Sequence, residues 1–181
     1  CGLSFLRRAA SCVRPRLDIV FFFNDTATTE IYTIFGSRAG LFEAFTTDLW
    51  ERNGLADVTA AVEVSDARAH LRGGLRAACR MLAGDLEVYR VLFSMTRLDP
   101  ASLGGAVESK ERHRSGGMAY LAQRLADQGA LRPGISPEHA ADLLWMLCGF
   151  GAVDLLHSGR GMSVDEAAQA LADTAERALC T

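Results

Sequence analysis

The feature that most constrains this chain is the helical spacing of its apolar residues between Ser37 and Cys180. In RAGLFEAFTTDLWERN, for example, Leu41, Phe45 and Leu49 recur four residues apart and therefore share one helix face. Helix start signals precede several such segments, and no convincing strand pattern interrupts them. The sequence predicts an all-α fold of about six helices joined by short connections.

The most apolar stretch is SPEHAADLLWMLCGFGAVDLLHSG, which opens with Ser136 at an N-cap position and Pro137 at the first helical position. From Ala140 to Leu156 the apolar residues fall on nearly every side, which predicts one long helix buried on several sides. Beyond it, Ser163 and Glu166 have the spacing of a capping box, which predicts the start of the last helix.

The composition excludes several classes of protein. A chain of 181 residues can bury a core without disulfides or a metal. Its five cysteines are scattered and contain no C-x-x-C pair, which argues against a disulfide framework or zinc site and favours a reducing cytosol. The net charge of −3 restricts any DNA contact to a local surface. No apolar run approaches the roughly 20 residues of a membrane span, so we expect a cytoplasmic protein without a membrane partner.

Motifs that carry catalytic chemistry are absent from the sequence. It contains no H-E-x-x-H, P-loop, G-x-S-x-G or G-x-G-x-x-G pattern. The histidines lie on separate segments, and no carboxylate pair sits on an apolar face. We expect a protein that is not an enzyme and that uses no metal and no cofactor.

The segment FFFNDTATTEIYT, from Phe21 to Thr33, has no helical period, unlike the rest of the chain. Asn24-Asp25 is typical of a turn, and the threonine-rich run favours extended structure. The segment resembles the translated read-through of sequencing-adapter DNA. This resemblance implies that residues 1–32 are foreign to the protein that follows them.

The segment IYTIFGSRAGLFEAF carries a second resemblance. An aromatic pair, Tyr32 and Phe35, precedes the turn Gly36-Ser37-Arg38 and an amphipathic helix. This order resembles the end of the helix-turn-helix of TetR-family (tetracycline-repressor-like) transcription regulators, where the aromatic pair closes the recognition helix. The two-helix sequence that precedes this point in the family is missing. The resemblance implies a truncated regulator, with a degenerate segment at 1–36 and a TetR-like helical ligand-binding and dimerisation domain at 37–181.

The resemblance also implies DNA-contacting residues. Tyr32 and Thr33 would donate hydroxyls to the phosphate backbone, and Arg38 would meet a phosphate near a helix N-terminus. Core packing is the alternative role for Tyr32, and a solvated surface charge is the alternative for Arg38. The intact parent protein would repress transcription at operator DNA until a small apolar effector binds.

The effector pocket is expected among the middle helices, where large and adaptable apolar side chains are available. The alternative is that these positions are filled core. The candidate lining residues are Phe93, Met95, Met118, Trp145 and Met146.

The last two helices are expected to form a homodimer interface. DLLWMLCGFGAVDLL is too apolar to expose, and VDEAAQALADTAERAL offers a seam of small residues. Packed against their two-fold mates, they would make an isologous four-helix interface. The alternative is a monomer whose last helix covers the core. The candidate interface residues are Leu144, Leu147, Val153, Ala168, Leu171 and Ala175.

Two other functions compete with the regulator. One is a helical small-molecule-binding protein that has no DNA role. The other is an all-α enzyme whose site has no recognised motif, although no clustered titratable groups in an apolar setting support it.

Overall fold

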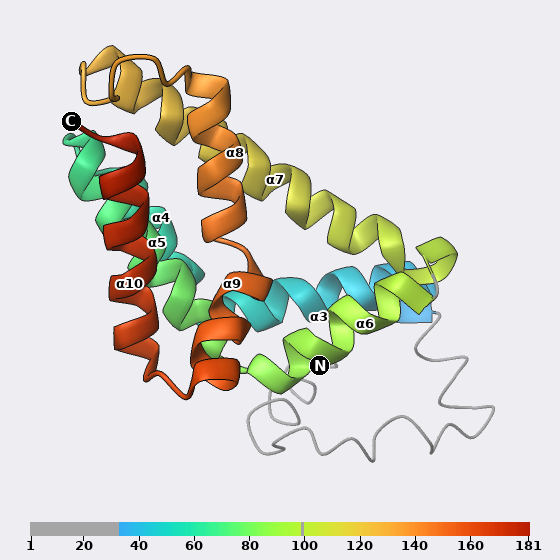
Figure 1. The fold of residues 1–181 in the computed structure, drawn as a ribbon. Coiled ribbons are helices and arrows are strands. Elements are labelled where there is room, and N and C mark those ends of the chain that lie inside the picture. The colour runs from blue at the N-terminus through green and yellow to red at the C-terminus, as the bar shows by residue number, and fades with distance from the viewer. Residues whose placement is uncertain (1–32, 99) are drawn as a thin grey trace. The chain divides into compact units, whose positions relative to one another are not determined.

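The computed structural model of the chain describes residues 33–98 and 100–181, and Figure 1 shows helices along this whole part of the chain. No β-strand occurs within these ranges; the one β-type pairing in them is an isolated bridge between Leu131 and Cys180. The all-α prediction is confirmed. The chain divides into a unit at residues 1–37 and a unit at 38–181. The segment at 1–32 lies outside the described residues.

The second unit contains the elements that define the candidate site. Its helices are α3 (Arg38–Arg52), α4 (Leu55–Val62), α5 (Ala67–Gly84), α6 (Leu86–Leu98), α7 (Pro100–Asp127), α8 (Pro137–Leu147), α9 (Phe150–Asp154) and α10 (Val164–Leu179). A π-helical turn, Leu155–Gly159, follows α9. Helix α3 ends at Arg52, and Gly54, two residues further on, has a φ of 104° that favours glycine.

Helix caps were predicted correctly where the capping side chain is next to its helix. The Ser136 side chain accepts a hydrogen bond from the backbone N–H of His139 at 3.2 Å, which starts α8. Ser163 and Glu166 form the predicted capping box at the start of α10. Each cap satisfies backbone N–H groups that have no partner inside the helix, and so fixes where the helix begins.

The prediction of one long helix from Ala140 to Leu156 is wrong, because the chain breaks at Cys148-Gly149. Gly149 has an extended backbone (φ −82°, ψ 153°), so the hydrogen-bond ladder stops after α8. Glycine is a poor helix former, and the segment holds two of them close together. The helical segments on either side of the break are bent by 47°.

One side of α8 lies in solvent. Trp145 is 45% exposed and Met146 is 56% exposed, so the helix is not buried all round. No single described helix is long and apolar enough to cross a membrane; α8 and the segment Phe150–Gly159 have that length and composition only as a bent pair.

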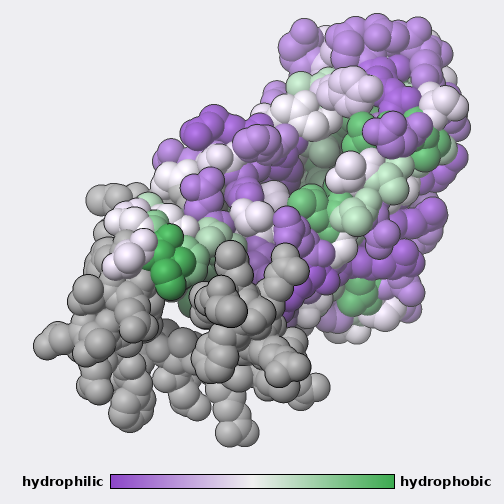
Figure 2. All heavy atoms as spheres, turned by 180° about the vertical axis from the view of Figure 1, so that it is seen from behind, coloured by the Kyte–Doolittle hydropathy of each residue, from purple (hydrophilic) through white to green (hydrophobic). Residues whose placement is uncertain are grey.

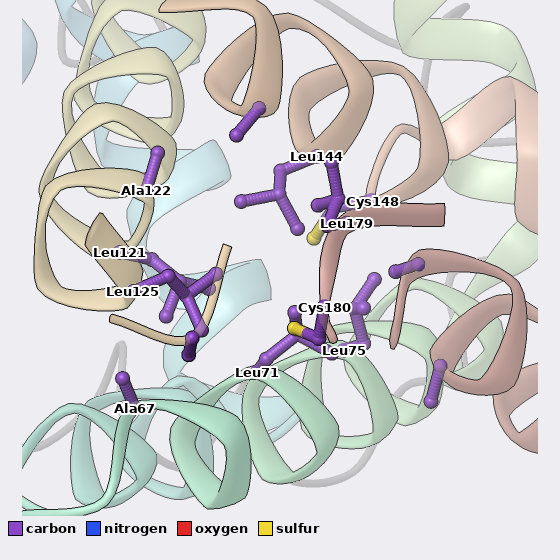
Figure 3. Packing of buried hydrophobic residues seen from close by; sticks show 14 of the residues in the cluster. Ala67, Leu71, Leu75, Leu121, Ala122, Leu125, Leu144, Cys148, Leu179 and Cys180 are labelled. Carbon is purple, nitrogen blue, oxygen red and sulfur yellow. The ribbon is translucent and has the colours of Figure 1, made fainter. Parts of the chain in front are cut away.

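Two apolar clusters form the core of the second unit. In the first, leucines from α5, α7, α8 and the end of α10 point toward one another; Figure 3 shows Leu71, Leu125, Leu144 and Leu179 among them. The second cluster joins α3, the end of α5, α6 and α9 around Tyr89. Removing this apolar surface from water is the main driving force for packing the helices together.

The six residues proposed for a dimer interface belong to this core or pack against it. Leu144, Val153, Ala168, Leu171 and Ala175 are buried within the single chain. The sixth, Leu147, is partly buried against both clusters. A side chain already buried in its own chain has no surface left to bury against a second copy. In this structure α10 covers the core, as the monomer alternative expects, while homodimer formation itself stays a prediction.

Ion pairs join neighbouring helices at the rim of the core. Arg72 of α5 pairs with Glu176 of α10 at 2.5 Å, and Arg90 of α6 pairs with Asp154 of α9 at 2.5 Å. Hydrogen bonds from Arg90 hold the pKa of the Asp154 carboxyl below its usual value. Both pairs are half-buried and connect residues far apart in the sequence, so they tie α5 to α10 and α6 to α9.

Candidate ligand cavity

A cavity of about 240 Å³ lies among helices α3 to α9. Its wall is almost entirely apolar. An engineered apolar cavity of about 150 Å³ holds benzene, so this one has room for about ten non-hydrogen atoms. In the space-filling view, apolar residues gather along part of one face between hydrophilic borders (Figure 2). Residues that line the cavity include Leu75, Leu92, Phe93, Met118, Leu121 and Leu144.

Two of the five predicted lining residues, Phe93 and Met118, lie at the cavity wall. The Phe93 ring stacks on the ring of Phe150, with centroids 4.9 Å apart and planes 11° apart, and Phe150 also lines the cavity. This stacking joins α6 to α9, which follows the break at Cys148-Gly149.

The other three predicted lining residues do not line the cavity. Met95 lies on the solvent side of α6 and is 40% exposed. Trp145 and Met146 point away from the core because α8 buries its opposite side, with Leu144 and Cys148. The prediction chose these residues for their size and apolar character, which do not determine which side of a helix faces the core.

Several cavity residues were not predicted, and they come from outside the most apolar segments. Thr46 and Trp50 of α3 line the cavity, as does Tyr89 of α6. The Tyr89 hydroxyl is buried without a hydrogen-bond partner in the described part of the chain, and burial raises the Tyr89 pKa to about 12. The sequence signal that could have found Trp50 is its place beside Leu49 on the apolar side of the first helix.

A buried histidine, His70 of α5, forms part of the cavity wall. Its Nδ1 lies 3.0 Å from Nη1 of Arg124. A guanidinium can only donate, so Nδ1 is the acceptor and the neutral ring carries its hydrogen on Nε2. Burial, together with the nearby Arg124 charge, lowers the pKa of His70. The ring is therefore neutral at physiological pH.

Arg124 also fixes the end of α4. Its guanidinium donates to the carbonyl oxygens of Val62 at 3.0 Å, Val64 at 2.6 Å and Ser65 at 2.8 Å. The last carbonyls of a helix have no partner inside it, and a cation is favourable at that end. Arg124 thus holds α4 and His70 against α7.

We expect acidification to destabilise the protein through His70. Because its folded-state pKa lies below the unfolded value of about 6.5, the unfolded chain binds more protons as pH falls. The stabilising contribution of the neutral His70 side chain is therefore fully present above about pH 6.5, and it is lost as the pH falls below that value. Urea unfolding of the wild type and of His70→Asn, which keeps an acceptor for Arg124, at pH 7.5 and about pH 5.5 tests this. The wild type should lose more stability between the two values; equal losses would contradict the role of His70.

At the other end of the cavity, Arg114 of α7 holds the broken end of α8. Its guanidinium pairs with Glu111 at 2.5 Å, donates to the Trp145 carbonyl at 2.6 Å and lies over the Trp145 ring at 4.8 Å. The Gly149 N–H bonds to the carbonyl of Met146, so the helix supplies no donor for the Trp145 carbonyl. Arg114 supplies it.

Lys110 lies one helical turn before Arg114 and also lines the cavity. Its ammonium donates to Oγ1 of Thr47 at 2.9 Å and lies 5.2 Å from the centroid of the Trp50 ring. Both contacts are to α3, so Lys110 joins the helix that follows the predicted DNA reader to the wall of the cavity.

The cysteine at the cavity, Cys148, behaves as an apolar group. Burial raises the pKa of its thiol to about 11, and burial raises that of Cys79 to about 12. Both thiols are therefore protonated at neutral pH. In the described part of the chain no three histidine, cysteine or acidic side chains gather as metal ligands would.

The predicted DNA-contacting residues lie at or before the start of this unit. Residues 33–35 are helical, Thr33 is exposed, and Gly36 has a φ of 71° in the turn before α3. Arg38 is the first residue of α3. Tyr32 lies outside the described residues. The three DNA-contact assignments stay predictions.

Comparisons of the chain with protein families, with curated proteins and with solved structures found no match.

Proposed function

We propose that this chain is the regulatory part of a TetR-like transcription repressor and binds a small, mostly apolar effector in the cavity between α3 and α9. The observation that supports the proposal best is the apolar cavity of about 240 Å³ within an all-helical unit. Such a pocket, with few polar groups in its wall, is the usual form of a small-molecule site. The effector needs neither metal nor cofactor. The parent protein would act on operator DNA in a bacterial cytoplasm.

The residues of the cavity wall suggest how a bound effector would change the orientation of the DNA reader. Thr46 and Trp50 belong to α3, which begins at Arg38, directly after the segment that resembles the end of a recognition helix. An effector that favours one position of α3 would shift the population of reader orientations. In a homodimer, the two readers would then no longer match successive major grooves.

A helical binding protein without a DNA role would use the same cavity, so the cavity does not distinguish the two functions. The sequence that precedes α3 distinguishes them. Resequencing the source DNA across the codons for Phe21 to Ser37 and well upstream makes the separation. We expect the FFFNDTATTEIYT codons to be replaced by a two-helix reader that ends in the aromatic pair. If the FFFNDTATTEIYT codons are confirmed instead, the role as a DNA-binding regulator is refuted and ligand binding remains as the function.

Calorimetric titration with 1-decanol, a neutral and mostly apolar probe of about the right size, tests the proposed ligand binding separately from DNA regulation. One molecule should bind per chain.

A further inference from the structure

We infer that the cavity takes an amphipathic carboxylate, with an apolar body in the cavity and its head group paired with Lys110. This rests on the proposed ligand-binding function and specifies the chemistry of the ligand. Given room for about ten non-hydrogen atoms, a medium-chain fatty acid or a small aromatic acid has the required size.

Lys110 is the only lysine of the chain, and its ammonium has no acidic partner among the described residues. Its ammonium is half-buried and contacts the Thr47 hydroxyl and the Trp50 ring, neither of which carries a negative charge. Within residues 33–98 and 100–181, no carboxylate lies within 4 Å of it, whereas Arg72 and Arg90 each have one. A partly desolvated cation without a partner gains most from a ligand that brings a negative charge.

The nearest acidic residue in the cavity wall does not compete for this charge. Glu111 is held by Arg114, with the two charged groups 2.5 Å apart. His113 is exposed, and its Nδ1 lies 2.8 Å from the carbonyl of Ser109. Among the described residues at this end of the cavity, Lys110 is therefore the cation without an acidic partner.

The position of Lys110 gives a bound molecule a direction. Along α7, the cavity wall continues from Lys110 through Gly117 to the apolar side chains Met118 and Leu121. A head group at Lys110 therefore leaves the apolar body among Met118, Leu121 and Phe93. A cationic ligand is disfavoured, because the face of Trp50 that could receive it is already occupied by Lys110.

Calorimetric titrations with decanoate and 1-decanol, which differ in the charge of the head group, test the inference. For the wild type at neutral pH, we expect decanoate to bind about tenfold more tightly than 1-decanol. Lys110→Met should abolish this preference and leave 1-decanol binding unchanged, and Lys110→Arg should retain the preference. Arg112→Met removes an exposed cation of the same helix and should behave as the wild type.

The possible results separate the two proposals. Equal binding of the two probes by the wild type, or a preference for decanoate that survives in Lys110→Met, would overturn the carboxylate site while leaving the cavity as a neutral apolar site. Failure of both probes to bind would refute the proposed ligand-binding function itself. Thermal unfolding of each variant identifies any loss that comes from misfolding, and Lys110→Gln, which keeps a donor for Thr47, then replaces Lys110→Met.

Discussion

Replacing Leu144 with alanine is expected to lower the free energy of unfolding by about 3 kcal/mol. Leu144 is 0% exposed, lies in the first apolar cluster and also lines the cavity. Truncation removes buried methyl groups and enlarges an existing void. The cost therefore includes the lost transfer free energy of those groups and the free energy of the larger cavity. Urea unfolding followed by circular dichroism measures the change.

The same helix offers a matched control for Leu144→Ala. Met146 lies two residues further on and is 56% exposed, so Met146→Ala should change stability by less than about 0.5 kcal/mol. The loss in Leu144→Ala should also be independent of protein concentration over about a hundredfold range, since the residue packs within one chain. A loss that appears only at high concentration would instead place Leu144 in a dimer interface.

Replacing Gly117 with leucine is expected to weaken binding of 1-decanol by about 2 kcal/mol, or roughly thirtyfold. Gly117 lines the cavity, and a Cβ placed there would meet no atom within 4 Å. The introduced side chain therefore has room, and on a helix it leans toward the preceding turn, over the part of the wall formed by Arg114. It would occupy space that the ligand needs.

Gly116 provides the control for Gly117→Leu. A Cβ at Gly116 also meets no atom within 4 Å, but Gly116 does not line the cavity. Both substitutions replace a glycine inside α7 with a better helix former, so both should stabilise the fold by up to about 1 kcal/mol. Only Gly117→Leu should weaken binding. Equal weakening by the two variants would show that the ligand does not sit in this cavity.

The sequence predicted the helices well because their signals are local. Ser136 and Ser163 stand next to the N–H groups that they cap, and the four-residue spacing of apolar side chains marks each buried face. The break at Gly149 could not be read in the same way, because a run of apolar residues looks alike whether the helix continues or bends. Which side of α8 is exposed depends on its packing against α7 and α10, which the local sequence does not show.

The site was harder to predict than the fold because its polar residues depend on which helices meet. Phe93 and Met118 could be chosen from size and apolar character alone. Lys110 belongs to the charged stretch ESKERHR, which reads as a solvated surface until α7 packs against α3 and brings the lysine to Trp50. The buried His70 likewise finds its partner Arg124 fifty-four positions further along the chain.

Whether the cavity binds a small, mostly apolar molecule is decided by calorimetric titration of the unaltered chain with 1-decanol. We expect saturable binding of one molecule per chain, weakened roughly thirtyfold in Gly117→Leu and unchanged in Gly116→Leu. Absence of saturable binding to the folded, unaltered chain would contradict it.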